Sequence, residues 1–208
     1  MTHLKKILEQ GLLELNLNLS PEQIKQLLDY LALLQKWNKV YNLTAITNLT
    51  EMVILHLLDS LAIIPHLKGQ TFLDVGTGAG LPGLVLAIAR PDWQITLLDS
   101  NSKKTRFLIQ MMAELQLQNV KVICSRIEHW KTEQKFEVIT SRAYSDLKQF
   151  YEQCSPFCTQ SGYLAAMKGK LPANELENIS NYQIIPLVVP HLSQERHLIC
   201  LNKDNGMS

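Results

Sequence analysis

The sequence lacks an excess of charge of either sign. Among 208 residues, Lys and Arg total 20 while Asp and Glu total 19, which gives a formal net charge of +1. A polyanion would therefore have to be bound by a local cluster of cations rather than by the field of the whole protein. The near balance neither indicates nor excludes binding to nucleic acid.

Cysteine is scarce, and its spacing is not that of a metal site. The cysteines are Cys124, Cys154, Cys158 and Cys200, and none belongs to a C-x2-C pair. No signal-peptide pattern precedes them, so we expect reduced thiols in a cytoplasmic protein without a bound metal. No uninterrupted apolar run approaches the ~20 residues needed to cross a bilayer, so no membrane association is expected.

The first 66 residues have the spacing of helices. Ser20 begins a capping box that Gln23 completes. Beyond it, apolar residues recur at helical spacing at Ile24, Leu27, Leu28, Leu31 and Leu34. A second helix is expected over about residues 51–64, with a loop at residues 37–47 where Asn and Thr favour turns. We therefore predict an N-terminal helical extension over residues 1–66.

From residue 67 onward the pattern changes to alternating strands and helices. Short, nearly continuous apolar runs occur in the segments TFLDV, QITLLD, VKVIC, FEVITS and YLAAM. Segments of helical period separate them, which predicts an α/β fold with a mostly parallel sheet and helices on both faces. The last two segments, YQIIPLVVP and ERHLICLN, have little helix between them and predict an antiparallel C-terminal strand pair.

A glycine-rich turn follows the first predicted strand. The stretch LDVGTGAGLPG places Gly76, Gly78 and Gly80 between that strand and the next predicted helix. Open α/β sheets bind ligands at the carboxyl ends of their strands, and glycine permits both positive φ and close approach of a ligand to the backbone. The turn is therefore expected to bind a cofactor, although a tight turn without a ligand is the alternative.

The spacing of the glycines distinguishes between cofactors. A phosphate-binding loop would need Lys and Ser or Thr where Leu84 and Val85 stand. A dinucleotide fingerprint would need its third glycine where Leu81 stands. The pattern D-x-G-x-G-x-G, which begins at Asp74, instead resembles the first motif of class I S-adenosylmethionine-dependent methyltransferases. This resemblance implies a Rossmann-like methyltransferase domain over residues 67–208 with S-adenosylmethionine as its cofactor.

Two further strand ends supply candidate cofactor contacts. Asp99 ends the second strand, where a carboxylate can accept hydrogen bonds from both ribose hydroxyls. The alternative is that Asp99 helps to cap the following helix. Ile127 and Glu128 follow the third strand and are expected beside the adenine, although Glu128 is equally well explained as the start of a surface helix.

The fourth strand end lacks the groups that activate a poor nucleophile. After FEVIT come Ser141, Arg142, Ala143 and Tyr144, with neither the [DN]-P-P-[YFW] motif of amino-group methylases nor a cysteine nucleophile. The acceptor should therefore already be nucleophilic, as is N7 of guanine, which carries no proton. Catalysis would then consist mainly of positioning and exclusion of water, without a general base.

Several segments together resemble one known family, the glucose-inhibited division protein B family. They are WNKVYNLTAI, HLLDS, FLDVGTGAGLPG, LLDS, SRA, MKGK and ERHL, in this order along nearly the whole chain. Members of that family are bacterial methyltransferases of guanine N7 in small-subunit (16S) ribosomal RNA. The resemblance implies the same fold and activity, with ribosomal RNA as partner, either free or within an assembled subunit. The pair His129-Trp130 departs from the family pattern.

The resemblance also assigns residues to roles. Its cofactor positions fall on Gly76, Leu81, Ile127, Glu128 and Arg142. Arg142 would orient the methionine carboxylate or contact RNA. Independently of the resemblance, Lys168 ends the fifth predicted strand at the same crevice and is therefore a candidate contact for a phosphate or guanine O6. His56 and Asp59, three residues apart, would line the acceptor entrance, or alternatively make a capping or helix-to-sheet bond. The role of Arg196 is left open.

Cations for RNA binding are few. Residues 1–65 carry one more acid than base, so this segment is no basic arm. The alternative patch is Lys103, Lys104, Arg106, Arg126, Arg142, Lys168 and Lys170. So modest a charge favours a structured or assembled substrate that is recognised by shape. A small-molecule or protein methyltransferase and a non-catalytic ribosome-assembly module are the alternatives.

Overall fold

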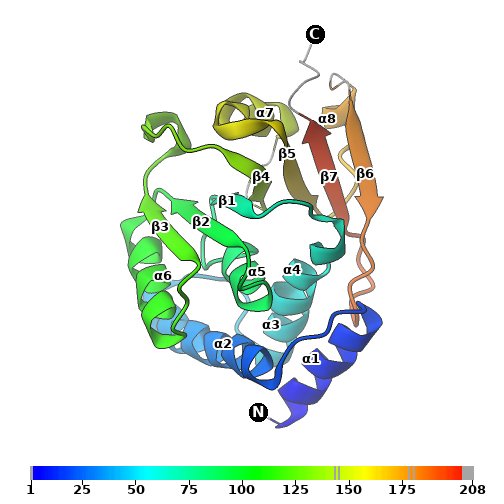
Figure 1. Ribbon diagram of the computed structural model, residues 1–208. Helices are drawn as coiled ribbons and strands as arrows, with labels where there is room; N and C mark the ends of the chain where they lie inside the picture. The colour runs from blue at the N-terminus through cyan, green and yellow to red at the C-terminus, as the bar shows by residue number, and fades with distance from the viewer. Residues whose placement is uncertain (1, 143, 145, 178, 180, 203–208) are drawn as a thin grey trace.

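The computed structural model describes residues 2–142, 144, 146–177, 179 and 181–202. Its centre is a seven-stranded sheet in the order β3-β2-β1-β4-β5-β7-β6 (Figure 1). The strands are β1 (Thr71–Val75), β2 (Gln94–Asp99), β3 (Val120–Cys124), β4 (Phe136–Ser141), β5 (Cys158–Lys168), β6 (Tyr182–Pro186) and β7 (His197–Asn202). The first five strands pair in parallel, and β7 is antiparallel to both β5 and β6. The predicted sheet and its antiparallel C-terminal pair are confirmed.

Helices cover both faces of this sheet (Figure 1). One face carries α1 (Thr2–Glu14), α2 (Pro21–Tyr41), α3 (Leu49–Met52), η1 (Val53–Leu58), α4 (Asp59–Leu61), η2 (Ile64–His66), α5 (Gly83–Ala89) and α6 (Ser102–Glu114). The other face carries α7 (Leu147–Cys154) and α8 (Ala173–Leu176), with η3 (Ile127–His129) and η4 (Ser155–Phe157) near them. Each face has its own apolar core, because the strands are buried on both sides.

The first helices share a core with the sheet. Buried leucines of α1 and α2 belong to the same cluster as those of α5 and α6. Gln23 closes the predicted capping box with Ser20 and also donates to the carbonyls of Ile88 and Ala89 at the end of α5. The segments before and after residue 66 therefore share one apolar core. A domain boundary at residue 66 stays a prediction.

Two helix boundaries differ from the sequence prediction. Residues 37–41, expected in a loop, form the last turn and a half of α2. Trp37 stacks on Tyr41 and contacts Phe107 of α6, and this packing extends the helix until Asn42 adopts a left-handed conformation. The second predicted helix begins two residues earlier, at Leu49, and contains the π-helical segment η1. Tertiary contacts outweighed local turn propensity at the end of α2, whereas the earlier start at Leu49 has a local cause, the N-cap of Asn48.

The helical stretch Leu49–His66 is long and apolar enough to cross a membrane by composition. In the folded chain 61% of this stretch is buried, as is typical of a helix in the core of a protein. Cys154 and Cys158 are likewise buried in the core of the opposite face, in agreement with a packing role.

Candidate active site

The glycine turn has the backbone conformation that its composition predicts. Gly76, Gly78 and Gly80 all have positive φ, at 67°, 61° and 97°. The turn begins directly after β1 and leads into α5, so its backbone lies at the carboxyl end of the sheet. Tyr30 of α2 supports it from below, because its buried hydroxyl donates to the carbonyl of Ala79 at 2.8 Å.

Asp74 holds the turn together from inside. One of its carboxylate oxygens accepts from the Thr77 hydroxyl at 2.6 Å and from the Gly83 amide at 2.8 Å. The side chain is almost fully buried, and this burial raises the pKa of Asp74 to about 6, although both hydrogen bonds act in the opposite direction. Asp74, the acid of the sequence motif, thus stabilises the turn from its buried side.

The glycines of the turn meet different surroundings. A Cβ atom at Gly80 would lie 2.8 Å from Cβ of Leu84 and 3.0 Å from a methyl group of Leu108, so this glycine lets α5 and α6 pack closely. A Cβ atom at Gly78 would find nothing nearer than the Gly76 carbonyl at 3.9 Å. Gly78 therefore borders open space, where a ligand can approach the main chain.

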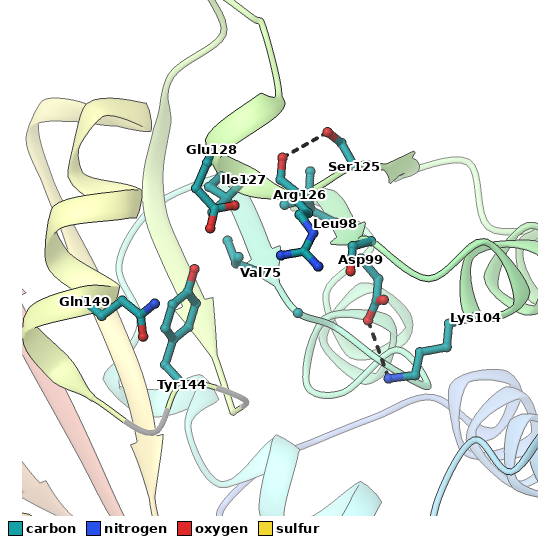
Figure 2. Close-up of a pocket in the computed structure, with 12 residues that line it drawn as sticks. Val75, Leu98, Asp99, Lys104, Ser125, Arg126, Ile127, Glu128, Tyr144 and Gln149 are labelled. Atoms are coloured by element: carbon teal, nitrogen blue, oxygen red, sulfur yellow. Dashed lines mark hydrogen bonds and ion pairs between the residues drawn. The ribbon is translucent and has the colours of Figure 1, made fainter.

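Beside the turn lies a cavity of about 430 Å³, at the carboxyl ends of β1, β2 and β3, whose lining includes Gly76 but not Gly78. It is lined by Val75, Gly76, Leu98, Asp99, Ser100, Lys104, Ser125, Arg126, Ile127, Glu128, Tyr144 and Gln149. Figure 2 shows Asp99 and Lys104 on one side and Tyr144 and Gln149 on the other, with the guanidinium of Arg126 between them. The predicted residues Gly76, Asp99, Ile127 and Glu128 are therefore brought together in one cavity.

Asp99 connects the end of β2 to the glycine turn. Its Oδ2 accepts from the Gly78 amide at 2.9 Å, and its Oδ1 accepts from the Asn101 amide at 2.8 Å. The N-cap of α6 is Asn101, whose side chain accepts from the Lys103 amide, so capping falls to Asn101 rather than to Asp99. A carboxylate has about four acceptor positions, so Asp99 keeps capacity for ligand hydroxyls.

On the far wall of the cavity, apolar and polar contacts alternate. Ile127 is buried at the start of η3, whereas Glu128 is exposed and accepts from the Gln153 amide at 3.0 Å. Tyr144 donates its hydroxyl to the same glutamine at 2.9 Å. Trp130, which belongs to the pair that departs from the family pattern, stacks on Phe157 with ring centroids 5.5 Å apart and so packs behind this wall.

A second cluster links the N-terminal helices to the end of β4. The carboxylate of Asp59 is 3.0 Å from Nε of Arg196 and 3.3 Å from a terminal nitrogen of Arg142. Arg142 also donates to the Leu55 carbonyl at 3.2 Å. Asp59 is buried, which raises its pKa, while the two arginines oppose that shift. The predicted bond from the helix to the sheet is therefore present at Asp59, whereas its role at the acceptor entrance stays a prediction.

His56 lies one turn before Asp59, in the π-helical segment. It is buried, with Nε2 3.1 Å from the Thr44 hydroxyl. Burial and the nearby charge of Arg142 lower the pKa of His56 to about 4. The imidazole is therefore neutral at physiological pH.

A neutral buried histidine predicts how stability depends on pH. The pKa of His56 rises from about 4 in the folded chain to the ordinary 6.5 on unfolding, so the unfolded chain binds more protons between these values. The contribution of His56 to the free energy of unfolding should fall by about 1 to 2 kcal/mol from pH 7 to pH 5. In urea unfolding, the free energy of unfolding of His56→Gln should fall less from pH 7 to pH 5 than that of the parent protein. His66→Gln, which changes an exposed histidine, should show the same fall as the parent protein. Equal slopes would contradict the burial of a neutral imidazole.

The remaining predicted residues lie away from the cavity lining. Gly80 and Leu81 are packed beneath the turn, and Arg142 and His56 belong to the second cluster. Lys168 donates to the Tyr144 carbonyl at 3.2 Å and pairs with Glu175 at 2.9 Å. The functional roles of these residues stay predictions. Ala143 of the SRA motif lies outside the described residues.

Three of the seven cations of the expected basic patch have an acidic side chain close by. Lys104 lies 3.9 Å from Asp99, Arg142 pairs with Asp59 and Lys168 pairs with Glu175. Arg126 lines the cavity and is exposed there. Sequence reasoning missed the cavity positions of Lys104, Arg126 and Gln149. The first two adjoin predicted strand ends and could have been found, whereas no local signal marks Gln149 on α7.

Within the ranges that the structure describes, no group of three or more His, Cys, Asp or Glu side chains is arranged to hold a metal ion.

Known proteins resemble this chain over most of its length. A family model described as rRNA small subunit methyltransferase G (GidB) matches residues 23–199. The ribosomal RNA small subunit methyltransferase G of Laribacter hongkongensis is 48% identical over 203 residues, covering 96% of this chain and 98% of the relative. That of Chromobacterium violaceum is 49% identical over 197 residues, covering 92% and 94%.

Solved structures agree with the fold. An S-adenosylmethionine-dependent methyltransferase from Aquifex aeolicus aligns with a TM-score of 0.52 at 19% identity, covering 70% of this chain and 90% of that one. Coclaurine N-methyltransferase aligns with a TM-score of 0.52 at 18% identity, covering 80% and 56%. At such low identity these likenesses speak for the fold alone.

Proposed function

Because this chain belongs to the rRNA small subunit methyltransferase G family, we propose that it transfers a methyl group from S-adenosylmethionine to N7 of a guanine in small-subunit ribosomal RNA. The observation that carries the proposal is the cavity itself, at the carboxyl ends of β1 to β3. It combines the glycine turn at Gly76 with the carboxylate of Asp99, which also accepts from the amide of Gly78 beside the cavity. The chain would act in the cytoplasm, where ribosomal subunits are assembled.

The residues present fit S-adenosylmethionine. The open side of the glycine turn would accept the methionine part, and Asp99 would accept hydrogen bonds from the ribose hydroxyls. Ile127 would pack against the adenine and Glu128 would accept from its amino group. The bound sulfonium would supply an electrophilic methyl group. Arg142 and Lys168 are proposed to position the acceptor from the ends of β4 and β5.

The acceptor is inferred from what the cavity contains. Among the described residues, the twelve that line it include neither a His nor a Cys, and its two carboxylates, Asp99 and Glu128, are assigned to the ribose and the adenine. His56, in the neighbouring cluster, is held neutral by burial and bonds to Thr44, so it is placed to position rather than to shuttle protons. Guanine N7 has an in-plane lone pair and no proton, so its methylation requires alignment and a dry site rather than a base.

Loss of the protein should remove one modified nucleoside from the cell. Ribosomal RNA from cells without this chain should lack one 7-methylguanosine in the small subunit when digested and measured by mass spectrometry. Return of the gene, but not of a variant that cannot bind the cofactor, should restore it. An unchanged nucleoside profile would refute the proposed activity. Assays that compare free 16S RNA with assembled small subunits would identify the preferred substrate.

A further inference from the structure

A second hollow lies at the end of α2, in the segment of the WNKVYNLTAIT motif for which the cofactor site has no use. It measures about 470 Å³ and is lined by Gln35, Asn38, Lys39, Asn42, Thr44, Ala45 and Thr47. Apart from Ala45 and the lysine, this lining consists of side-chain amides and hydroxyls. Ligand pockets of small molecules are typically a few hundred cubic ångströms in size. The hollow is therefore large enough for one nucleotide.

The hollow is held open by its own hydrogen bonds. Asn38, which is buried, donates to the Thr44 carbonyl at 2.9 Å and accepts from the Thr44 amide at 2.9 Å. Gln35 donates to the Thr47 carbonyl at 3.3 Å. These bonds fix the loop against the helix end, so little conformational entropy would be lost when a ligand enters.

The charge around the hollow suits an anionic partner. The described residues that line it include one cation, Lys39, and no Asp or Glu. On the same helix end, Val40 is 72% exposed and Tyr41 is 41% exposed. Exposed aromatic rings beside cations are the surface on which single-stranded nucleic acid stacks. The amides and hydroxyls of the lining can pair with base edges and 2′-hydroxyls.

The hollow adjoins the acceptor side of the proposed site. Thr44, one of its lining residues, has its hydroxyl 3.1 Å from Nε2 of His56. The carbonyl of the preceding residue, Leu55, accepts from Arg142, which directly follows β4. Two contacts thus connect the hollow to the strand end where the acceptor is expected.

We propose that this hollow is a ribonucleotide subsite, which binds a nucleotide that flanks the target guanine in the RNA. The inference rests on the proposed function, since it names how the RNA substrate is held. Lys39 would contact the phosphate, Asn42 and Thr47 would contact the base edge, and Tyr41 would stack against a neighbouring base. The buried pair of Thr44 and His56 would hold the wall of the subsite in register with Arg142.

Filling the hollow should weaken RNA binding alone. Ala45 is exposed within it, so Ala45→Phe would occupy the space without removing any hydrogen bond. The matched control is Ala32→Phe, at an exposed position of α2 outside the hollow. We expect Ala45→Phe to raise the KM for small-subunit RNA by about tenfold or more, by steric exclusion. Its kcat and its affinity for S-adenosylmethionine should stay at the control's values. Equal KM values for the two variants would overturn the proposal.

Charge gives a second, independent comparison. Lys39→Gln should raise the KM for RNA and lower the slope of its logarithm against the logarithm of salt concentration by about 1, as loss of one phosphate contact does. Lys36→Gln, an exposed lysine on the same helix that does not line the hollow, should do neither. If the two variants behave alike, the effect is that of general charge and the proposed phosphate contact is wrong.

The occupant can be identified without activity. A short single-stranded RNA oligonucleotide added to the isotope-labelled full chain should shift the amide resonances of residues 35–47, and Ala45→Phe should abolish the shifts. If the oligonucleotide shifts nothing there, the subsite is refuted. If Ala45→Phe impairs methylation of protein-containing subunits but not of naked RNA, the hollow contacts a ribosomal protein, and the ribonucleotide proposal is also overturned. Failure of the parent protein to methylate RNA, with the shifts intact, would refute the proposed function alone.

Discussion

Replacement of Asp59 by alanine is expected to lower the free energy of unfolding by about 3 kcal/mol, because loss of one partner of a buried ion pair leaves the other charge uncompensated. Here one carboxylate serves two guanidinium groups, at 3.0 Å from Arg196 and 3.3 Å from Arg142. The arginine side chains are 20% and 26% exposed, so water would soften the loss. Urea unfolding at neutral pH measures the effect.

Asp92 offers a matched control for this prediction. It pairs with Arg90 at 2.6 Å, a shorter distance, but the two side chains are 55% and 38% exposed. Exposed pairs contribute about 0 to 1 kcal/mol, so Asp92→Ala should change stability little. If Asp59→Ala costs no more than Asp92→Ala, the buried cluster does not hold the N-terminal helices to the sheet.

A second substitution at Asp59 separates stability from positioning. Because Asp59 orients Arg142 at the strand end beside the proposed acceptor, Asp59→Asn should lower kcat for RNA methylation even where the protein remains folded. The asparagine keeps an acceptor but removes the charge, so the arginines lose their shared anchor. Unchanged kcat with reduced stability would mean that the cluster is a structural tie and nothing more.

Replacement of Asp99 by alanine is expected to weaken binding of S-adenosylmethionine by about 1 to 3 kcal/mol, the range for hydrogen bonds to a charged group. This corresponds to a roughly 5- to 150-fold higher dissociation constant. Asp99 lines the cavity and accepts from Gly78, so both the ribose contact and the position of the turn depend on it. Calorimetric titration of the folded variant measures the loss.

Two comparisons separate the ribose contact from the local support. Asn101→Ala removes the N-cap of α6 and should cost about 1 kcal/mol of stability without a loss of affinity. The parent protein should bind a 2′-deoxy analogue of S-adenosylhomocysteine less tightly than S-adenosylhomocysteine itself. The Asp99→Ala variant should bind the two compounds with equal affinity. If the analogue is discriminated to the same degree by both proteins, Asp99 supports the turn and does not bind the sugar.

Sequence reasoning reached the cofactor half of the site more fully than the acceptor half. Gly76, Asp99, Ile127 and Glu128 each lie at or just after the end of a strand, and parallel strands bring their carboxyl ends to one edge. Their meeting was therefore predictable from the strand pattern. Asp59 and Arg196 are 137 positions apart, and no local pattern in either segment announces that they bond. The end of α2 was misjudged for the same reason, since contact with α6 decides where that helix stops.

The sequence by itself determined the alternation of strands and helices, the positive φ angles of the glycine turn and the acid at the end of β2. These depend on hydrophobic period and on local backbone freedom, which a short window of residues contains. The tertiary structure alone decided that Asp59 joins two arginines, that Gln149 reaches the cavity and that a hollow opens at the end of α2. Such contacts arise from the packing of elements far apart in the chain, and packing is a property of the whole core rather than of any segment.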